Sequence, residues 1–406
     1  MATVAKRTWT TRKDERKTAW VLTYHDRHGK RHRKQFRTKA AADAERVRVE
    51  GQLASGTHVP DRDSLSVEDA AKAFLLDFQD LVADGRRERS TLKKYREHIE
   101  LHLKPFDIAK VKLSRLSGPD CAAYAKALET NRSEAMGTRV FATFRQVLDL
   151  AWSKGWIHGN PASAVSVRTA GDRDEDEVQI PPKDQVRKLI DTAKTFDSTG
   201  RAHAMVTLLA FGGLRASEMR ALGKFNCRTK RNEVAINRRA DEWQKIGTVK
   251  SRNSRRTVPL PQLACEAIER WLPAAPDSDL DLAFPTGTGT VESYTNLYNR
   301  LWVPLMDKAG LTTHSLEERA GERPEDPKVK VKVVRPLFAL HALRHVAVSL
   351  WIEQGASPKQ VQTWAGHASI QFTMDTYGHL WRDRTSETAI VAAAERSIAN
   401  AKTEEH

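Results

Sequence analysis

The amino-acid sequence predicts a multidomain protein: a small β-sheet with one helix, then an all-α domain, then a mixed, mainly α domain with a small antiparallel sheet. Two observations support this fold class. The length of 406 residues suggests two or three domains. The residue pattern also changes twice, from strand-like runs to helical periodicity, and then, after a polar segment that ends in Pro-Pro, to a mixture of both. The expected divisions are 1–60, 66–165, a linker at 166–182, 183–384, and a C-terminal helix and tail at 385–406.

The composition favours a polyanionic partner. Lys and Arg number 67 against 52 Asp and Glu, so the net charge is +15 and the isoelectric point is near 9.7. This balance fits nucleic acid better than a membrane surface. No apolar run reaches the ~18 residues of a transmembrane helix, and the first residues lack the apolar core of a signal peptide. Cys121, Cys227 and Cys265 have no metal-ligand spacing. We therefore expect a cytoplasmic, nucleoid-associated protein without a metal or cofactor.

The first domain is the most basic part of the chain, with 15 Lys and Arg against six Asp and Glu in residues 1–60. Residues 20–24 predict a strand, 26–29 a turn and 30–36 a second strand, and Thr38 can cap a following helix. A two-stranded ribbon fits a DNA groove, although a solvated basic hairpin has the same pattern. The candidate DNA-binding residues here are Arg31, Arg33, Lys34 and Arg37.

The second domain has a helical pattern. Ser66 and Ser90 are expected to begin its first two helices, and two more are expected at 118–129 and 133–156. Its first gap is rich in Arg and Lys, which suits contact with a phosphate backbone; a solvated charged face is the alternative. The candidate DNA-binding residues here are Arg86, Arg87, Arg89, Lys93 and Lys94.

The third domain mixes helices and strands. Residues 184–211 predict one helix, a Gly-Gly pair at 212–213 breaks it, and strands are expected at 233–238 and 247–260 around a turn. The charged, Pro-broken segment 312–336 has no assigned role. A surface insertion, a flexible loop and a DNA contact all agree with its composition.

The most informative stretch begins at His341. His341 and Arg344 lie on one side of a predicted helix, and apolar residues surround the rest of it, so this helix is expected to be buried and polar only at its mouth. Burial of His and Arg is unfavourable unless an anion binds there. Gly355 is expected to end the helix, and a second one is expected to begin at Ser357 and end at Gly366. The polar residues beyond this second helix are His367 and Tyr377.

Two cations upstream complete a set of six. Arg215 follows the Gly-Gly break and Lys250 precedes a hairpin turn. Each of the six, taken singly, has an ordinary structural interpretation, such as a surface ion pair or a helix cap. Together, the segments that contain them resemble the motifs of the tyrosine recombinase (phage integrase) family in order and spacing, over about 200 residues. These segments are GGLRASEMRAL, TVKSRNSRRTVPLP, HALRH and AGHASIQFTMDTYGH.

The resemblance implies a role for each residue. Tyr377 would be the nucleophile that attacks a DNA phosphodiester, and Arg215 and Arg344 would bind the nonbridging oxygens bidentately. His341 and His367 would add hydrogen bonds, and one of them can help to remove the tyrosine proton. Such a set stabilises charge without a metal. The covalent 3′-phosphotyrosine conserves the energy of the broken bond, so rejoining needs no ATP.

The leaving group would take its proton from Lys250. Lys245 is the alternative, and strand alternation places the two lysines on opposite faces; the motif context favours Lys250. The sequence departs from the family pattern at Ala342, where an acidic residue is frequent, and at Val346, where a small hydroxyl residue is frequent. Neither is one of the six, so both are interpreted as changes in packing.

The resemblance also implies partners. The first domain would bind arm-type attachment sites and the helical domain would bind core sites on double-stranded DNA. The enzyme would act as a homotetramer, with a directionality factor and a host DNA-bending protein as further candidate partners. The C-terminal helix would dock either on its own domain or on a neighbouring subunit.

The function implied is that of an integrase, which cleaves and rejoins DNA through a Holliday junction and integrates or excises a phage or mobile element. A chromosome-dimer resolvase is one alternative, but it has no need of an arm-binding domain. A type IB topoisomerase fits the domain layout and the order of the motifs less well. A DNA-binding protein that has lost catalysis is the alternative from another class, and the complete set of six residues argues against it.

Overall fold

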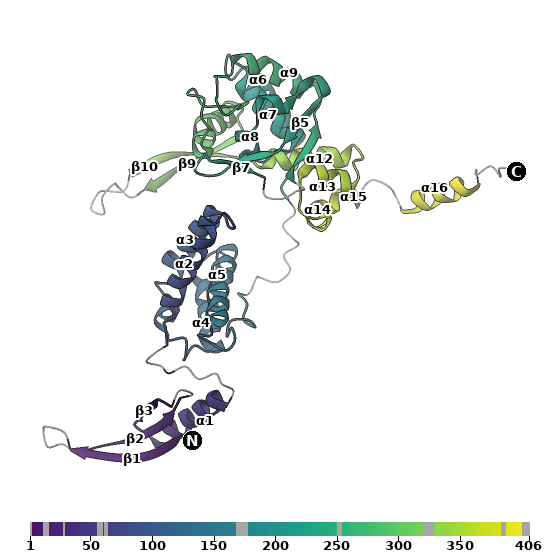
Figure 1. The fold of residues 1–406 in the computed structure, drawn as a ribbon. Helices are drawn as coiled ribbons and strands as arrows, with labels where there is room; N and C mark the ends of the chain where they lie inside the picture. Colours follow the sequence, from purple (N-terminus) through teal and green to yellow (C-terminus); the bar gives the residue numbers. More distant parts are fainter. Residues whose placement is uncertain are drawn as a thin grey trace. The chain divides into compact units, whose positions relative to one another are not determined.

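The computed structural model describes residues 2–10, 16–26, 29–54, 60, 64–167, 178–249, 254–319, 329–382 and 387–399. The chain divides into two compact units, Met1–Arg173 and Asp174–His406 (Figure 1). The described elements are mostly helical, with small antiparallel sheets, as the predicted fold class requires. The division into five segments stays a prediction.

A three-stranded antiparallel sheet and one helix make up the N-terminal part. The strands are β1 (Thr3–Thr10), β2 (Arg16–His25) and β3 (Arg31–Phe36), in the order β1-β2-β3, and the helix is α1 (Lys39–Ala54). The two predicted strands and the helix are present, and the Thr38 hydroxyl accepts a hydrogen bond from the Ala41 amide. Strand β1 was not predicted. Most of its side chains are exposed, and it exists because it pairs along its whole length with β2.

Four helices follow: α2 (Val67–Ala83), α3 (Arg89–His102), α4 (Gly118–Asn131) and α5 (Glu134–Ser153), with a short 3₁₀ turn at Asp107–Lys110. Ser66 caps α2 as expected and forms a reciprocal capping box with Asp69. Helix α5 ends three residues earlier than predicted, at Ser153. The core combines aliphatic side chains with a group of aromatic ones, in which Tyr124 packs edge-on against Phe144.

The second unit begins with α6 (Lys183–Lys194) and α7 (Arg201–Gly212). The prediction of one continuous helix over 184–211 was wrong. The Asp197 carboxylate accepts hydrogen bonds from the amides of Arg201 and Ala202, and Gly200 adopts a left-handed φ of +80°. These local interactions begin a new helix. Its last residue precedes Gly213, whose left-handed φ of +60° ends it.

The rest of this unit alternates short helices and strands. The helical segments are α8 (Ala216–Arg220), α9 (Gln262–Trp271), α10 (Tyr294–Asn296), a π-helical turn at Leu297–Trp302 and α11 (Val303–Lys308); 3₁₀ turns lie at Lys224–Asn226, Thr229–Arg231 and Leu272–Ala274. Strands β4 (Cys227–Arg228), β5 (Glu233–Ile236) and β8 (Arg256–Pro259) form one sheet in the order β4-β5-β8. Strands β6 (Arg238–Ala240) and β7 (Ile246–Thr248) form a second. Most of the predicted turn between β7 and β8 lies outside the described residues.

The segment 312–336 contains a hairpin. Strands β9 (Thr312–Arg319) and β10 (Val329–Pro336) pair antiparallel, with Thr312 opposite Pro336. Figure 1 shows this hairpin extending from the side of the second unit. A regular pair of strands replaces the flexible loop that was one of the three interpretations of its composition.

The last helices are α12 (Ala342–Glu353), α13 (Pro358–Ala365), α14 (Ile370–Tyr377), α15 (His379–Arg382) and α16 (Glu387–Ala399). Helix α12 packs along α7 and is buried on nearly every side, as predicted. Gly355 follows it with φ of +89°, Ser357 caps α13 in a box with Gln360, and Gly366 ends α13 with φ of +66°. These stops turn the chain back on itself, so that α13 and α14 pack against each other beside α12.

Candidate active site

Arg215 stands at the start of α8, immediately after the left-handed turn at Gly213. Glu218, one turn later, holds it in two ways. One carboxylate oxygen accepts the Arg215 backbone amide at 2.8 Å, and the other accepts guanidinium Nη1 at 2.8 Å. The side chain of Arg215 remains 36% exposed, so this guanidinium is fixed in direction while part of it is open to a ligand.

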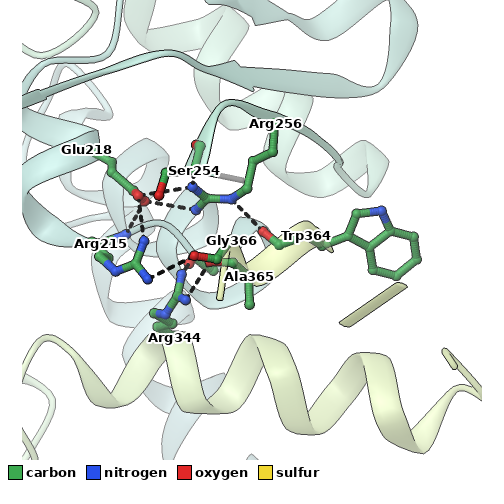
Figure 2. A network of polar contacts seen from close by, with 9 residues as sticks. Arg215, Glu218, Ser254, Arg256, Arg344, Trp364, Ala365 and Gly366 are labelled. Carbon is green, nitrogen blue, oxygen red and sulfur yellow. Dashed lines mark hydrogen bonds and ion pairs between the residues drawn. The ribbon is translucent and has the colours of Figure 1, made fainter. Parts of the chain in front are cut away.

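Three guanidiniums converge on the C-terminal end of α13 (Figure 2). Each donates to a different backbone carbonyl of residues 364–366: Arg256 Nε to Trp364 at 2.6 Å, Arg344 Nη2 to Ala365 at 2.5 Å, and Arg215 Nη2 to Gly366 at 3.2 Å. The last carbonyls of a helix lack partners within the helix and carry the negative end of its dipole. The end of α13 therefore gathers arginines that come from α8, β8 and α12.

Glu218 and Arg256 form a buried ion pair beneath this cluster. Both Glu218 oxygens accept from the Arg256 guanidinium, at 2.9 and 2.8 Å, and the side chains are 3% and 1% exposed. Burial alone would raise the pKa of Glu218, but the hydrogen bonds and charge of Arg256, together with Arg215, lower it to about 2. The carboxylate is therefore charged at neutral pH and links Arg215 to Arg256.

Arg344 lies deeper than Arg215. Its Nη1 donates to the Gly213 carbonyl at 2.6 Å, so it joins the turn before α8 to the end of α13. Burial and the neighbouring charge of Arg215 lower the pKa of Arg344 to about 9, and the side chain still carries its proton at neutral pH. An anion near this pair would relieve the repulsion between the two cations.

His367 follows Gly366 and is buried against the tyrosine. Its Nδ1 lies 2.9 Å from the Thr373 hydroxyl, and its ring is nearly parallel to that of Tyr377, with centroids 6.1 Å apart. Burial and the charges of Arg344, Arg215 and other neighbours lower its pKa to about 3. His367 is thus a neutral ring at physiological pH.

Tyr377 ends α14 with its ring in an apolar cluster that includes Val348 and Val361. The residue is 1% exposed, and its hydroxyl lies 2.6 Å from Nδ1 of His345 on α12. Burial raises the pKa of Tyr377, while the charges of Arg344 and Arg215 act in the opposite direction. The tyrosine is therefore a protonated phenol within the electric field of two guanidiniums.

His341 occupies the mouth of the site. It precedes α12, is exposed, and lies edge-on to His345 with ring centroids 5.1 Å apart. Partial desolvation and the charges of Arg344 and Arg215 lower its pKa. The polar mouth expected from the sequence is therefore present.

The structure gathers five of the six predicted site residues, and the sixth, Lys250, lies outside the described residues. Lys245, the alternative to Lys250, is exposed beside β7. The roles assigned to the six remain predictions.

Sequence reasoning missed three residues of the site. Glu218 could have been found as the acidic third residue of a helix that begins at Arg215. Arg256 lies two residues before the buried Val258 on β8, so strand alternation places both side chains on the core side. His345 follows His341 by one helical turn and shares its face.

The predicted DNA-binding residues differ in exposure. Arg31 and Arg33 are exposed on one face of β3, and Arg37 is exposed just beyond it. Lys34 lies on the opposite face of β3, turned towards α1, where it forms an ion pair with Glu45 at 2.6 Å. Its role in DNA binding stays a prediction, as do those of the other candidates. The candidates of the helical domain are all exposed; they are Arg86, Arg87, Arg89, Lys93 and Lys94.

A glycine comparison tests the packing at the end of α13. Replacing Gly366 by Ala forces a left-handed alanine, which costs about 1–2 kcal/mol, and places its Cβ 2.9 Å from Arg256 Nη1. Gly355→Ala also places an alanine at a positive φ, of +89°, but nothing lies within 4 Å of its Cβ. We expect Gly366→Ala to lower the free energy of unfolding, measured by urea titration, by more than Gly355→Ala does. Equal losses would show that Arg256 is not held in place at this point.

A buried tyrosine held beside paired arginines, in a mainly α unit with small antiparallel sheets, is the arrangement of a tyrosine recombinase catalytic unit. Residues 182–384, half of the chain, match the phage integrase family, and the chain belongs to that family. It is a tyrosine site-specific recombinase, an enzyme that breaks and rejoins DNA strands.

Similar proteins include the tyrosine recombinase XerD of Caulobacter vibrioides. It is 27% identical over 252 residues, which are 61% of this chain and 72% of XerD. Among solved structures, the Tn1549 transposon integrase in complex with a circular intermediate DNA has a TM-score of 0.62 at 15% identity, over 82% of this chain and all of that one. A lambda integrase dimer bound to a COC′ core site has a TM-score of 0.54 at 14% identity, over 93% of this chain and 96% of that one. At these identities the two structures show a shared fold. Within the described part of the chain, no helix has the length and apolar character needed to span a membrane.

Proposed function

We propose that this recombinase is an integrase, which joins a phage or other mobile element to a host chromosome and excises it through a 3′-phosphotyrosine intermediate and a Holliday junction. The observation that carries the proposal is the Tyr377 hydroxyl, buried in a site where Arg215 and Arg344 converge. A phenol is a poor nucleophile at neutral pH, so it needs cations that stabilise the charge of the transition state.

The site supplies that stabilisation. Arg215, which is partly exposed, and Arg344, which lies behind it, offer guanidinium forks to the two nonbridging oxygens of a phosphodiester. His341 at the mouth and His367 beside the tyrosine are neutral donors or acceptors for the same phosphoryl group. Lys250 is proposed to protonate the 5′ oxygen as it leaves.

The N-terminal part favours an integrase over a chromosome-dimer resolvase. A basic three-stranded sheet with exposed Arg31 and Arg33 fits a DNA groove, and we propose that it binds arm-type sites. The exposed cations at the start of α3 are proposed to contact the phosphates of the core site. A resolvase that acts on a short core site alone would not need the basic surface of the N-terminal sheet.

Assembly as a tetramer on DNA forms part of the proposal. The fold is shared with a lambda integrase tetramer bound to a Holliday junction, at a TM-score of 0.53 and 14% identity. Helix α16 is proposed to dock on a neighbouring subunit. A directionality factor and a host bending protein are proposed as further partners.

Deletion of residues 1–60 tests the integrase proposal. Recombination between long DNA fragments that span the junctions of the element should be lost, because the arm sites go unbound. Cleavage of a short core substrate should persist, because the catalytic residues lie elsewhere. Both are measured by gel electrophoresis, with Arg31→Ala/Arg33→Ala as a milder variant that should weaken recombination in the same direction.

Two results would contradict the assignment of arm-site binding to residues 1–60 and of cleavage to the rest of the chain. Equal loss of both activities would mean that residues 1–60 are not a separate DNA-binding module. Unchanged recombination between long fragments would favour a resolvase that acts on short sites.

A further inference from the structure

His345 is the one polar partner described for the tyrosine hydroxyl, and the six motif residues do not include it. It lies on α12, one turn after His341 and directly after Arg344. The distance of 2.6 Å between its Nδ1 and the Tyr377 oxygen is that of a strong hydrogen bond. The hydroxyl of Tyr377 is therefore hydrogen-bonded to a candidate proton acceptor, His345, which directly follows Arg344 in the sequence.

The chemistry of the two groups sets the direction of this bond. Tyr377 is a phenol with a raised pKa, so its O–H is present at neutral pH. Burial, His341 and Arg344 lower the pKa of His345 to about 4, so the imidazole is neutral. The phenol then donates to Nδ1, and the ring proton resides on Nε2.

The neighbouring histidines are less well placed to accept this proton. Nδ1 of His367 lies within hydrogen-bond distance of the Thr373 hydroxyl, and the ring is stacked nearly parallel to Tyr377, with an interplanar angle of 9°. Ring nitrogens accept protons in the plane of the ring, so a parallel ring does not direct them at the phenol oxygen. His341 lies edge-on to His345, with ring centroids 5.1 Å apart, and the hydrogen bond described for the Tyr377 hydroxyl is to His345.

We propose that His345 Nδ1 is the base that accepts the phenolic proton when Tyr377 attacks the DNA phosphorus. This inference deepens the proposed function and rests on it. The Tyr377 O–P bond forms while the bond from phosphorus to the 5′ oxygen breaks. The tyrosine proton moves to Nδ1, and the 5′ oxygen takes its proton from Lys250 or from water.

The surroundings make the transfer depend on substrate. Without DNA, burial and the neighbouring His341 and Arg344 disfavour an imidazolium at this position. A bound phosphodiester brings a negative charge into the same site, which favours the protonated ring. In the rejoining step a 5′ hydroxyl attacks phosphorus and gives its proton to Lys250 or to water. The bond from phosphorus to the Tyr377 oxygen breaks, and His345 returns its proton to that oxygen. One histidine thereby acts as base in cleavage and as acid in rejoining.

Two substitutions separate proton transfer from positioning. His345→Asn keeps a hydrogen-bond acceptor near the position of Nδ1 but cannot take the proton, and His345→Ala removes both. Single-turnover formation of the covalent protein–DNA adduct is measured on a nicked suicide substrate at saturating protein, from pH 5.5 to 9. We expect both variants to react about 100-fold more slowly than the unmodified protein. Their rates should rise about tenfold per pH unit where the unmodified protein has reached a plateau.

The leaving group provides an internal control. In a substrate whose bridging 5′ oxygen is replaced by sulfur, the leaving thiolate needs no proton, so the defect of Lys250→Ala should be relieved. The defect of His345→Asn should persist on this substrate, because the tyrosine proton must still be removed. His158→Asn, which changes an exposed histidine of the helical domain outside the candidate DNA-binding residues, should react normally on both substrates.

Rescue by added imidazole distinguishes the loss of a base from partial unfolding of a variant. His345→Ala should recover activity with imidazole, to an extent that increases with the basicity of the added compound. His345→Asn reacting at the normal rate with a normal pH profile would overturn the proposal and leave His345 as a positioning residue. Relief of the His345→Asn defect by the sulfur substrate would also overturn it. Failure of the proposed function is a separate outcome, an adduct that survives Tyr377→Phe.

Discussion

Tyr377→Phe is expected to abolish the covalent protein–DNA adduct and to leave DNA binding unchanged. The substitution removes the oxygen that is proposed to attack phosphorus and keeps the ring in its apolar cluster. Its structural cost is one hydrogen bond to His345, worth about 1 kcal/mol. The adduct is measured by denaturing gel electrophoresis on a nicked suicide substrate, and binding is measured by gel shift.

Tyr298 offers a matched control. It is a half-buried tyrosine of the same unit that stacks on Tyr294, and Tyr298→Phe should form the adduct at the normal rate. An adduct of undiminished amount in Tyr377→Phe would move the nucleophile to another residue.

Glu218→Ala is expected to produce the largest loss of stability. The substitution leaves Arg256, with a side chain that is 1% exposed, without its charge partner in the core. Removing one member of a buried pair typically costs about 3–5 kcal/mol. The free energy of unfolding is measured by urea titration. Adduct formation should also fall, because Arg215 loses the carboxylate that fixes its direction.

Glu353→Ala is the control for Glu218→Ala. Glu353 pairs with Lys183 on the surface, where its side chain is 40% exposed, and such pairs contribute at most about 1 kcal/mol. A loss in Glu218→Ala no larger than in Glu353→Ala would mean that the buried pair does not hold the site together.

The same carboxylate predicts an effect of acid. The pKa of Glu218 is lowered in the folded state, from 4.5 to about 2, so its stabilising contribution is complete above pH 4.5 and is lost as the pH falls towards 2. This shift corresponds to roughly 3 kcal/mol. Within this window the difference in stability between the unmodified protein and Glu218→Ala should shrink as the pH is lowered.

The sequence was most informative where function depends on local pattern. The His341–Arg344 spacing and the stops at Gly355 and Gly366 predicted a buried helix with a polar mouth and a turn that returns the chain to it. These features depend on residues within one or two helical turns of each other. The structure contains all of them.

Contacts between distant segments could not be predicted in the same way. Glu218 and Arg256 are 38 residues apart, and nothing in either local pattern identifies the other. The convergence of three arginines on the end of α13 arises because α8, β8 and α12 pack around it. The edge strand β1 likewise depends on its partner β2, since few of its own side chains are buried.

The break between α6 and α7 was not predicted, although the residues that cause it are close together in the sequence. Asp197 and Gly200 are local signals for a helix start, but the apolar residues on either side continue the helical pattern and conceal them. The hairpin β9–β10 was missed although Lys330 and Lys332 alternate with Val331 and Val333, which is a strand pattern. The many charges and the prolines of the segment 312–336 concealed that short alternation.

The central claim is that DNA becomes joined to Tyr377 through a 3′ phosphate. Its most direct test is mass spectrometry of the trapped adduct after digestion of both the protein and the DNA. We predict a nucleotide on the peptide that contains Tyr377, attached to the phenolic oxygen by its 3′ phosphate. A nucleotide on any other residue, or a 5′ linkage at Tyr377, would contradict the mechanism.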